Sequence, residues 1–492
     1  MEKSNVWSSY NDDQLTELEH ISTLYKSCLN EGKTERECVK IAIRMAEEKG
    51  YLNLSDLIRS NTPVKSGDKI YAVCMNKSIS LFNIGRKPLE EGMNILGAHI
   101  DSPRMDVKQN PLYENEEFAY LDTHYYGGIK KYQWVTLPLA IHGVVVKTTG
   151  ETVDVCIGEN DDEPVFAVTD LLIHLAGKQM DRKASIVIEG EKLDLLVGSR
   201  PIDADDAADK DAGADAGASD GSSAAECAAS DDSSDKKSVK DAVKKNVLRL
   251  LDEFCGMTED DFVSAELEIV PAGKARDLGF DRSMVMSYGQ DDRVCAFTSL
   301  FAMLDTDRTD RTSCCILVDK EEIGSVGATG MHSRFFENTV AEILTLMGET
   351  SDLKVRRALQ NSKMLSSDVS AAYDPMYADV FEKRSSAFFA KGLVFNKFTG
   401  SRGKSGSNDA NAEYLAALRK ALDDDEVAYQ FAELGKVDAG GGGTIAYIMA
   451  NYGMEVIDSG VAVLCMHAPW EITSKADIYE AYKGYKAFLT NM

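Results

Sequence analysis

A strand that is apolar along its whole length places the strongest constraint on how this chain folds. Residues 314–318 read Cys-Cys-Ile-Leu-Val, a run rich in β-formers that predicts a strand buried on both faces. Glu321 and Glu322 follow it, beyond the carboxyl end where α/β sheets gather their ligands. Because neighbouring residues of an extended chain point in opposite directions, one glutamate is suited to bind a metal and the other to hold a water. The alternative is surface charge at a solvated strand end.

Three more strands are predicted to end on residue types that bind metals. An apolar strand from Asn94 reaches His99, the segment KMLSSD ends at Asp368, and VAVLCMH ends at His467. Asp101 lies two residues beyond His99 on the same face, so its carboxylate is placed to fix the tautomer of the imidazole. For His99 alone, a satisfied histidine of the core is the alternative interpretation.

Two aspartates stand where a helix is predicted to begin. Apolar residues recur at helical spacing from Val294 to Leu304, and Asp291 and Asp292 precede them. The helix dipole favours carboxylates at this end, so capping alone would account for them. Asp291 is also suited to bridge two cations. With the strand ends, the chain offers two histidines and three carboxylates, a set that suits two divalent metals in a hydrolase: zinc, with manganese or cobalt as alternatives.

The composition excludes several kinds of partner. A formal net charge of −27 argues against nucleic acid and anionic membranes. No apolar run approaches the roughly eighteen residues that span a bilayer. Ten cysteines, scattered without a CxxC pair, indicate a reduced, cytoplasmic protein. The 492 residues exceed what one core normally accommodates, so two domains are expected.

The second domain is predicted to be an insertion. Over residues 112 to about 198 the chain consists of short β-like segments such as LAIHGVVV, VDVCIG, PVFAV and ASIVIEG, separated by turn residues. Residues 203–235 form a tract of Asp, Ala, Ser and Gly with eleven acids and one lysine, which is predicted to be disordered. We therefore predict a discontinuous α/β domain, 1–104 and 246–492, and a β-rich domain, 105–245, that contains the acidic tract.

The segments that carry the candidate residues resemble one known family. GAHIDSP, QDDR, DKEEIGS, SSDVSAAYDP and CMHAPWE occur in the order and at the spacing of the aspartyl aminopeptidase and vacuolar aminopeptidase I family of dinuclear zinc metallopeptidases. The similarity covers nearly the whole chain outside the acidic tract. It implies metal-dependent release of N-terminal amino acids from peptides. Another hydrolase with a similar metal cluster, such as a carboxypeptidase or a deacetylase, and a non-catalytic scaffold are the alternatives.

The resemblance implies roles for particular residues. Glu321 would be the general base, which takes a proton from a metal-activated water and returns it to the leaving amine, and Asp101 would orient His99. The implied ligands of two metals, with Asp291 as the bridge, are His99, Asp291, Glu322, Asp368 and His467. The choice of Asp291 over Asp292 and the metal used in the cell stay open.

The resemblance also implies a fold and an assembly. The expected fold is a zinc-peptidase-like α/β catalytic domain, with a central mixed sheet flanked by helices, and a smaller inserted β-rich dimerisation domain. Dimers would assemble into a dodecamer. In that family a histidine of the smaller domain reaches the active site of the dimer mate, and the segment VTDLLIHLAG makes His174 the candidate. A buried structural histidine is the alternative.

Two features are candidates for substrate binding. A basic patch contains Lys397, and the glycine-rich loop at residues 438–444, which contains Gly442, would allow a ligand to approach the backbone closely. The patch hints at an acidic N-terminal residue in the substrate. Because the resembled family includes enzymes for acidic and for neutral or hydrophobic residues, the preferred residue stays open.

Overall fold

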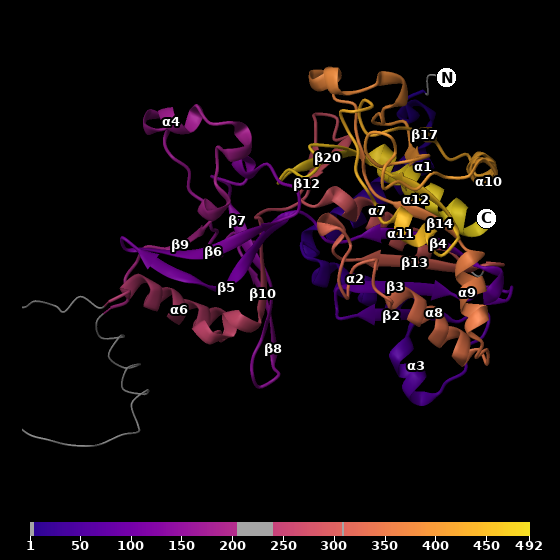
Figure 1. Ribbon diagram of the computed structural model, residues 1–492, viewed down its shortest axis with the longest axis horizontal. Coiled ribbons are helices and arrows are strands. Elements are labelled where there is room, and N and C mark those ends of the chain that lie inside the picture. The colour runs from indigo at the N-terminus through magenta and orange to yellow at the C-terminus, as the bar shows by residue number, and fades with distance from the viewer. Residues whose placement is uncertain (1–3, 204–239, 308) are drawn as a thin grey trace, which may run out of the picture. The chain divides into compact units, whose positions relative to one another are not determined.

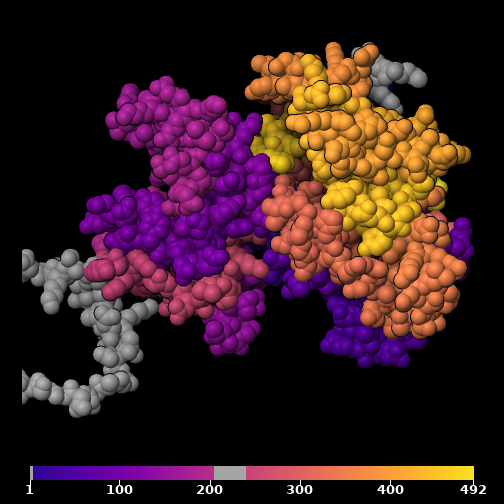
Figure 2. Space-filling model, in the orientation of Figure 1, coloured from indigo at the N-terminus to yellow at the C-terminus, as the bar shows by residue number. Residues whose placement is uncertain are grey.

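The computed structural model describes residues 4–203, 240–307 and 309–492. The chain divides into two compact units: a larger one of Met1–Arg104, Tyr126–Gln133 and Val270–Met492, and a smaller one of Met105–Tyr125 and Trp134–Ile269. In the space-filling view the last part of the chain, coloured orange to yellow, forms one continuous region of the larger unit (Figure 2). Within the described ranges, no helix combines the length and the apolar character needed to span a membrane.

A nine-stranded mixed sheet organises the larger unit (Figure 1). In spatial order its strands are β1 (Leu52–Asn53), β2 (Lys69–Cys74), β3 (Ser78–Asn83), β13 (Thr312–Val318), β4 (Met93–His99), β14 (Lys363–Ser367), β18 (Glu455–Gly460), β16 (Leu393–Asn396) and β17 (Tyr429–Phe431). The four strands β13, β4, β14 and β18 run parallel to one another, while β3 and β16 pair antiparallel at either side of them. The predicted α/β class with a central mixed sheet is confirmed.

Helices cover both faces of this sheet and bury two hydrophobic cores. One face carries α1 (Asp12–Glu31), α2 (Glu35–Glu48), α7 (Gln290–Leu304), α10 (Ala412–Asp424) and α12 (Lys475–Asn491); the other carries α3 (Leu54–Ser60), α8 (Phe335–Leu346), α9 (Asp352–Gln360) and α11 (Ala446–Ala450). Along β13, Cys314, Ile316 and Val318 belong to one core, and Cys315 and Leu317 belong to the other. The prediction of a strand buried on both faces is therefore confirmed.

The helix α7 is buried on every side, whereas the sequence pattern predicted an apolar stripe on one face. All 15 of its residues are buried, and it packs against β4 and α12. Asp291 and Asp292 have non-helical backbone angles, and the N-cap is Gly289. Capping therefore does not account for the two aspartates.

The carboxyl ends of the parallel strands meet at one edge of the sheet, and the candidate residues lie there. His99 is the last residue of β4, Asp368 directly follows β14, and the short helix η8 (Glu321–Ile323) follows β13. Beyond β18 the chain enters a five-stranded sheet of β11 (Arg276–Leu278), β12 (Met284–Ser287), β20 (Glu471–Ser474), β19 (Ala462–Leu464) and β15 (Ser370–Ala371). His467 lies in the connection between β19 and β20.

The smaller unit contains a six-stranded sheet, which confirms the expected β-rich character. Its order is β8 (Thr152–Ile157), β7 (Leu139–Val146), β10 (Ala265–Pro271), β5 (Arg104–Asn115), β6 (Phe118–Tyr126) and β9 (Leu195–Gly198). The segment ASIVIEG, expected as a strand, instead forms a 3-10 turn, η5 (Ala184–Ile186). Among the described residues, no neighbouring strand pairs with the β-branched residues of this segment.

The boundary of the smaller unit differs from the predicted one. The smaller unit extends to Ile269, so residues 246–269, which were assigned to the larger domain, belong to it. These residues form most of α6 (Ala242–Cys255), whose Val247 packs close to Gly198 of β9, and the first part of β10. Of the acidic tract predicted to be disordered, residues 204–235 lie outside the described residues.

Candidate active site

Asp291 lies between two imidazole rings. Its Oδ1 is 3.4 Å from Nε2 of His99, and its Oδ2 is 3.2 Å from Nε2 of His467. The side chain of Asp291 is almost fully buried. One carboxylate thus faces two ring nitrogens that come from distant parts of the chain.

His99 is held from its other side by Asp101. The Nδ1 atom of His99 lies 3.0 Å from the backbone oxygen of Asp101 and 3.3 Å from its Oδ1. A proton on Nδ1 satisfies these acceptors and would leave Nε2, which faces Asp291, free to offer its lone pair to a bound metal. Both residues are buried. The orienting role expected for Asp101 would act through these contacts and stays a prediction.

His467 is oriented in the same way by a backbone group. Its Nδ1 is 2.9 Å from the carbonyl oxygen of Gly128 and donates to it, which would leave Nε2 free to offer its lone pair to a bound metal. Nε2 then faces Asp291 and, at 3.7 Å, Oε2 of Glu322. His467 has a positive φ of 64°, an uncommon conformation that aims the ring back toward the sheet edge.

The adjacent glutamates are positioned by the same aspartate that orients His99. The backbone N–H of Glu321 donates to Oδ1 of Asp101 at 3.1 Å, and that of Glu322 donates to Oδ2 at 3.2 Å. The hydroxyl of Tyr126 also donates to Oδ2 of Asp101, at 2.8 Å. Asp101 therefore fixes a histidine and both glutamates at once.

At this edge of the sheet, two groups of ligand atoms are close enough to hold metal ions. One consists of His99, Asp291 and Glu322, and the other of His99, Asp292 and Asp368, with all ligand atoms of a group within 4.8 Å of one another. The Oδ1 atom of Asp368 is 3.8 Å from Nε2 of His99. The strand ends predicted to meet are thus brought together, and Asp292, the alternative to Asp291, lies there too.

Comparison with known proteins identifies the family to which the chain belongs. Residues 28–489 match the Aminopeptidase I zinc metalloprotease (M18) family. A probable M18 family aminopeptidase 1 of Clostridium acetobutylicum is 57% identical over 490 residues, which cover 100% of this chain and 98% of that protein. The chain belongs to the M18 family.

Solved structures of M18 proteins have the same fold. A crystal structure of an M18 aminopeptidase from Thermotoga maritima superposes with a TM-score of 0.88 at 40% identity, and aminopeptidase I from C. acetobutylicum with 0.87 at 55%, each covering 100% of both chains. The dodecamer of S. cerevisiae mApe1 is 19% identical, with a TM-score of 0.73 over 95% of this chain and 96% of that one. This M18 protein is a zinc metalloaminopeptidase that releases N-terminal residues, not a carboxypeptidase, a deacetylase or a scaffold.

The electrostatics of the M18 site favour a bound cation. Burial, followed by the charge of Asp368, raises the pKa of Glu321 to about 8, and burial next to Asp291 raises the pKa of Glu322 well above its ordinary value. Burial tends to lower the pKa of His467, but its hydrogen bond with Asp291 and the charge of Glu322 raise that pKa to about 10. Protons therefore relieve the repulsion among the buried acids, and a divalent metal would relieve it in their place.

A cavity of about 540 Å³ opens beside these residues. Gly442, expected to contact the substrate, lines it together with the loop at residues 440–444. Lys397 does not: its side chain is exposed, and the basic residues that line the cavity are Arg402, Lys404 and Lys436. Asn396 and Phe398, on either side of Lys397, line the cavity, and a role for Lys397 in substrate binding stays a prediction.

His174 belongs to the smaller unit, where it lies in the 3-10 turn η4 (Ile173–Leu175). Its side chain is exposed, so the alternative of a buried structural histidine is wrong for this chain. The segment was ambiguous in the sequence because its apolar residues suggested burial, yet Ile173 and Leu175 are also exposed.

Several residues of the M18 site were not singled out from the sequence. Glu471 ends the quoted motif CMHAPWE and accepts hydrogen bonds from the backbone N–H groups of Asp291 and His467. Asn396 and Asp458 line the cavity from neighbouring strands. A signal for Glu471 was present, since an acid four residues after a candidate ligand stood inside the motif. Asn396 and Asp458 gave none, because a single polar residue near a strand end is common.

Proposed function

We propose that this M18 aminopeptidase binds two metal ions per chain, both zinc, with Asp291 shared between them. The observation that supports this most directly is that the two carboxyl oxygens of Asp291 face different imidazoles, at 3.4 Å and 3.2 Å. The proposed ligands are His99, Asp291, Glu322, Asp368 and His467. Asp292, which lies in the group with His99 and Asp368, is the alternative bridging residue.

The donor set suits zinc. Two imidazoles and several carboxylates converge, and no cysteine belongs to either group, which is typical of a catalytic rather than a structural zinc site. Manganese and cobalt accept the same donors and are the alternatives. When bound, such metals act as Lewis acids that lower the pKa of water toward roughly 7.

In the proposed mechanism Glu321 moves the proton. Its Oε2 is 4.0 Å from Nε2 of His99, and its backbone is fixed by Asp101. The carboxylate of Glu321 takes a proton from the water that attacks the first peptide carbonyl. It then returns that proton to the leaving amine, so that the peptide bond breaks and the N-terminal amino acid is released. Glu321 must be ionised for the first step, and a bound cation lowers its raised pKa accordingly.

We further propose that the chain acts as a self-associated enzyme, in dimers that assemble into a dodecamer. Large apolar residues are exposed around His174 in the smaller unit: Leu172 is 53%, Ile173 68% and Leu175 69% exposed. Contiguous exposed apolar residues commonly mark an interaction surface. In a dimer His174 would donate a hydrogen bond to the developing oxyanion in the partner subunit. The cytoplasmic location expected from the sequence stays a prediction.

Metal stoichiometry tests the core of this proposal. Purified protein saturated with zinc and then desalted should contain two zinc ions per chain by plasma mass spectrometry. Asp291→Ala should lose both, whereas Asp368→Ala should retain one. A single zinc in the saturated wild-type chain, or an Asp291→Ala variant that still holds two, would refute the shared-ligand arrangement.

A further inference from the structure

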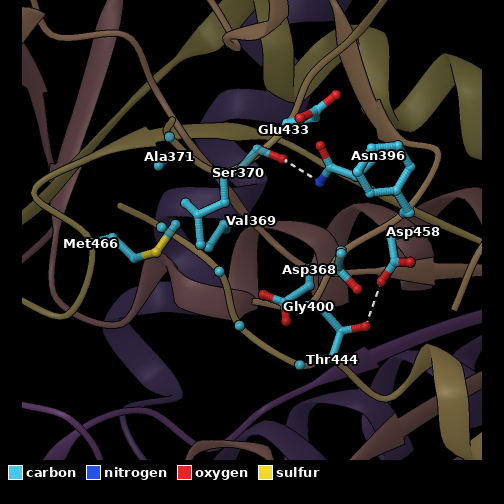
Figure 3. A pocket seen from close by; sticks show the side chains of 18 of the residues that line it. Asp368, Val369, Ser370, Ala371, Asn396, Gly400, Glu433, Thr444, Asp458 and Met466 are labelled. Carbon is cyan, nitrogen blue, oxygen red and sulfur yellow. Dashed lines mark hydrogen bonds between the residues drawn. The ribbon is translucent and has the colours of Figure 1, made fainter. Parts of the chain in front are cut away.

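Two polar side chains lie side by side in the wall of the cavity, away from the proposed metal ligands. Asn396 ends β16, and Asp458 lies directly opposite it in the antiparallel strand β18. Residues opposite each other on neighbouring strands project from the same face of a sheet. Both side chains line the cavity, as the close view shows (Figure 3).

The same face of the sheet leads from this pair to the proposed metal site. Asp458 lies opposite Ser366 in the parallel strand β14, and Asp368, two residues after Ser366, projects from the same face. Neighbouring strands lie about 4.8 Å apart, so Asn396 is about two strand spacings, roughly 10 Å, from the strand of Asp368. A substrate whose first carbonyl lies at the metal ligands would therefore extend the side chain of its first residue from Asp368 toward Asp458 and Asn396.

Each of the two side chains has one hydrogen-bond acceptor without a donor. Asn396 donates through Nδ2 to the hydroxyl oxygen of Ser370 at 3.1 Å, and its Oδ1 has no partner in the described chain. Asp458 accepts the hydroxyl of Thr444 through Oδ1, and its Oδ2 has no partner among the described residues. Asp458 is only 1% exposed. Buried acceptors are nearly always paired, so two such oxygens in one cavity wall indicate that a ligand supplies the donor.

The basic residues of the cavity do not offer a comparable inner site for an acid. Nζ of Lys404 donates to Asp409 at 3.0 Å, and Nζ of Lys436 donates to the backbone oxygen of Asp379 at 2.6 Å. Arg402 is exposed. Burial raises the pKa of Asp458 to about 7, so at pH 8 and above an acidic side chain that reached this pair would meet a mostly ionised carboxylate and an amide oxygen, both of which repel it.

We propose that Asn396 and Asp458 form the subsite for the side chain of the substrate's N-terminal residue, and that this subsite selects side chains that donate a hydrogen bond. Amide and ammonium side chains, as in glutamine and lysine, would pair with both free oxygens. A carboxylate side chain, as in glutamate, would be rejected. The inference rests on the proposed metal ligands, because they place the first carbonyl of the substrate.

Three substrates of nearly equal shape separate the possible outcomes. Glutamine, methionine and glutamate p-nitroanilides differ at the end of the side chain, which is a donor, an apolar group or a carboxylate. We expect kcat/KM of the zinc-loaded enzyme to be about 10- to 100-fold higher for glutamine than for glutamate, with methionine in between. Equal values for glutamine and glutamate, or a preference for glutamate, would overturn the proposal.

Two variants test whether Asp458 and Asn396 cause that preference. In Asp458→Asn the amide oxygen can still accept the hydrogen bond from Thr444, while an NH₂ group replaces the unpaired Oδ2. Asn396→Leu removes the other unpaired acceptor, Oδ1 of Asn396. Each should lower the ratio of kcat/KM for glutamine to kcat/KM for glutamate several-fold, whereas the surface control Asp424→Asn should leave that ratio and the activity on methionine unchanged. A uniform loss for all three substrates, with unchanged melting temperature, would instead assign the pair to the α-amino group and overturn the proposal.

A second readout does not depend on turnover. Free L-glutamine should inhibit hydrolysis of the methionine substrate more strongly than L-glutamate, and Asp458→Asn should remove that difference; equal inhibition in the wild type would overturn the proposal. Failure of the metal proposal gives a different result. The zinc content would then differ from two per chain while the preference among the three substrates could still be measured.

Discussion

Glu471 accepts the backbone N–H of Asp291 at 3.0 Å, although the two residues lie 180 positions apart in the chain. The other carboxyl oxygen of Glu471 accepts the backbone N–H of His467 at 2.8 Å. The side chain is buried, and burial followed by the charge of Asp291 raises its pKa to about 8. One carboxylate thus fixes the backbone of two proposed metal ligands from different elements.

This relationship predicts that Glu471→Gln weakens metal binding. The amide nitrogen would face an N–H group in place of an acceptor, so one of the two ligands would lose its position. Residues that orient metal ligands typically contribute about 10- to 100-fold to metal affinity. Competition with a chelating dye should show a loss of that size. The control Glu349→Gln, which makes the same change at a half-exposed residue outside the site, should bind zinc as the wild type does. Equal affinity in Glu471→Gln would contradict the prediction.

The ends of the strands were the part of the site that could be predicted from the sequence. Parallel strands present their carboxyl ends at one edge of the sheet. A histidine or an acid that directly follows an apolar strand can therefore be assigned to that edge from the sequence. His99, Asp368, Glu321 and Glu322 were therefore grouped correctly at this edge without knowledge of the strand order. Asp291 was grouped with them from its place at a helix start.

The adjacent glutamates should divide metal binding and proton transfer between them. Glu321→Gln should keep its fold and its zinc but lose turnover by about 10²–10⁴-fold, which is the usual contribution of a general base. Glu322→Gln should lose zinc, because Glu322 lies 3.7 Å from Nε2 of His467 in the proposed ligand set. Zinc content and kcat measured on the same preparations decide the matter. Equal loss of metal in both variants would contradict the assignment.

The raised pKa values predict how the metal-free protein responds to pH. Glu321 and Glu471 have pKa values of about 8 in the folded chain, so between about 4.5 and 8 the folded state binds more protons than the unfolded state. Stability should therefore fall as pH rises through this range. The contribution of His467 has the same sign: it is present below about 6.5 and is lost as pH rises through about 10.

Thermal unfolding of chelator-treated protein at pH 5, 6, 7 and 8 measures this effect. The melting temperature should fall with rising pH, and zinc should restore it most strongly at pH 8, since the metal takes the place of the bound protons. Glu321→Gln carries no titrating carboxyl at this position, so its melting temperature should fall less steeply. A melting temperature that rises from pH 5 to pH 8 without metal would contradict the assignment.

The acidic tract should be dispensable. Its flanks lie side by side, because the backbone N–H of Ile202 donates to the carbonyl oxygen of Ala242 at 3.0 Å. Replacing residues 203–235 by a short Gly-Ser linker should leave the melting temperature and peptidase activity nearly unchanged, since the tract contains almost no residues that could form a core. A large drop in melting temperature, or a smaller oligomer in light scattering, would show that the tract is structural.

Other features could not be predicted from the sequence because they depend on contacts between residues that are distant in the chain. Glu471 acts through backbone groups that no side-chain pattern marks. Asn396 and Asp458 become a pair only through the antiparallel register of β16 and β18. The predicted boundary of the smaller unit differs from the observed division for a similar reason. The helix α6 has the amphipathic pattern of any surface helix, and its partner β9 lies on the other side of the acidic tract in the sequence. Local periodicity predicts an element but not its partner.

The last prediction concerns His174 and the assembly. The side chain is exposed on the smaller unit among exposed apolar residues, so it is available to a second copy of the chain. If His174 completes the site of its partner subunit, His174→Ala and Glu321→Gln damage different parts of one composite site. Each homodimer is then inactive.

Mixing the two variants after dissociation and reassembly tests this arrangement. In a mixed dimer one of the two sites receives an intact Glu321 from one chain and an intact His174 from the other, so activity should return in up to about half of the dimers by random pairing. The mixture of Glu321→Gln with wild-type protein, treated in the same way, provides the reference for reassembly. If His174 acts only within its own chain, both sites of every mixed dimer carry a defect that cannot be complemented, and the mixture should be no more active than its two components measured separately.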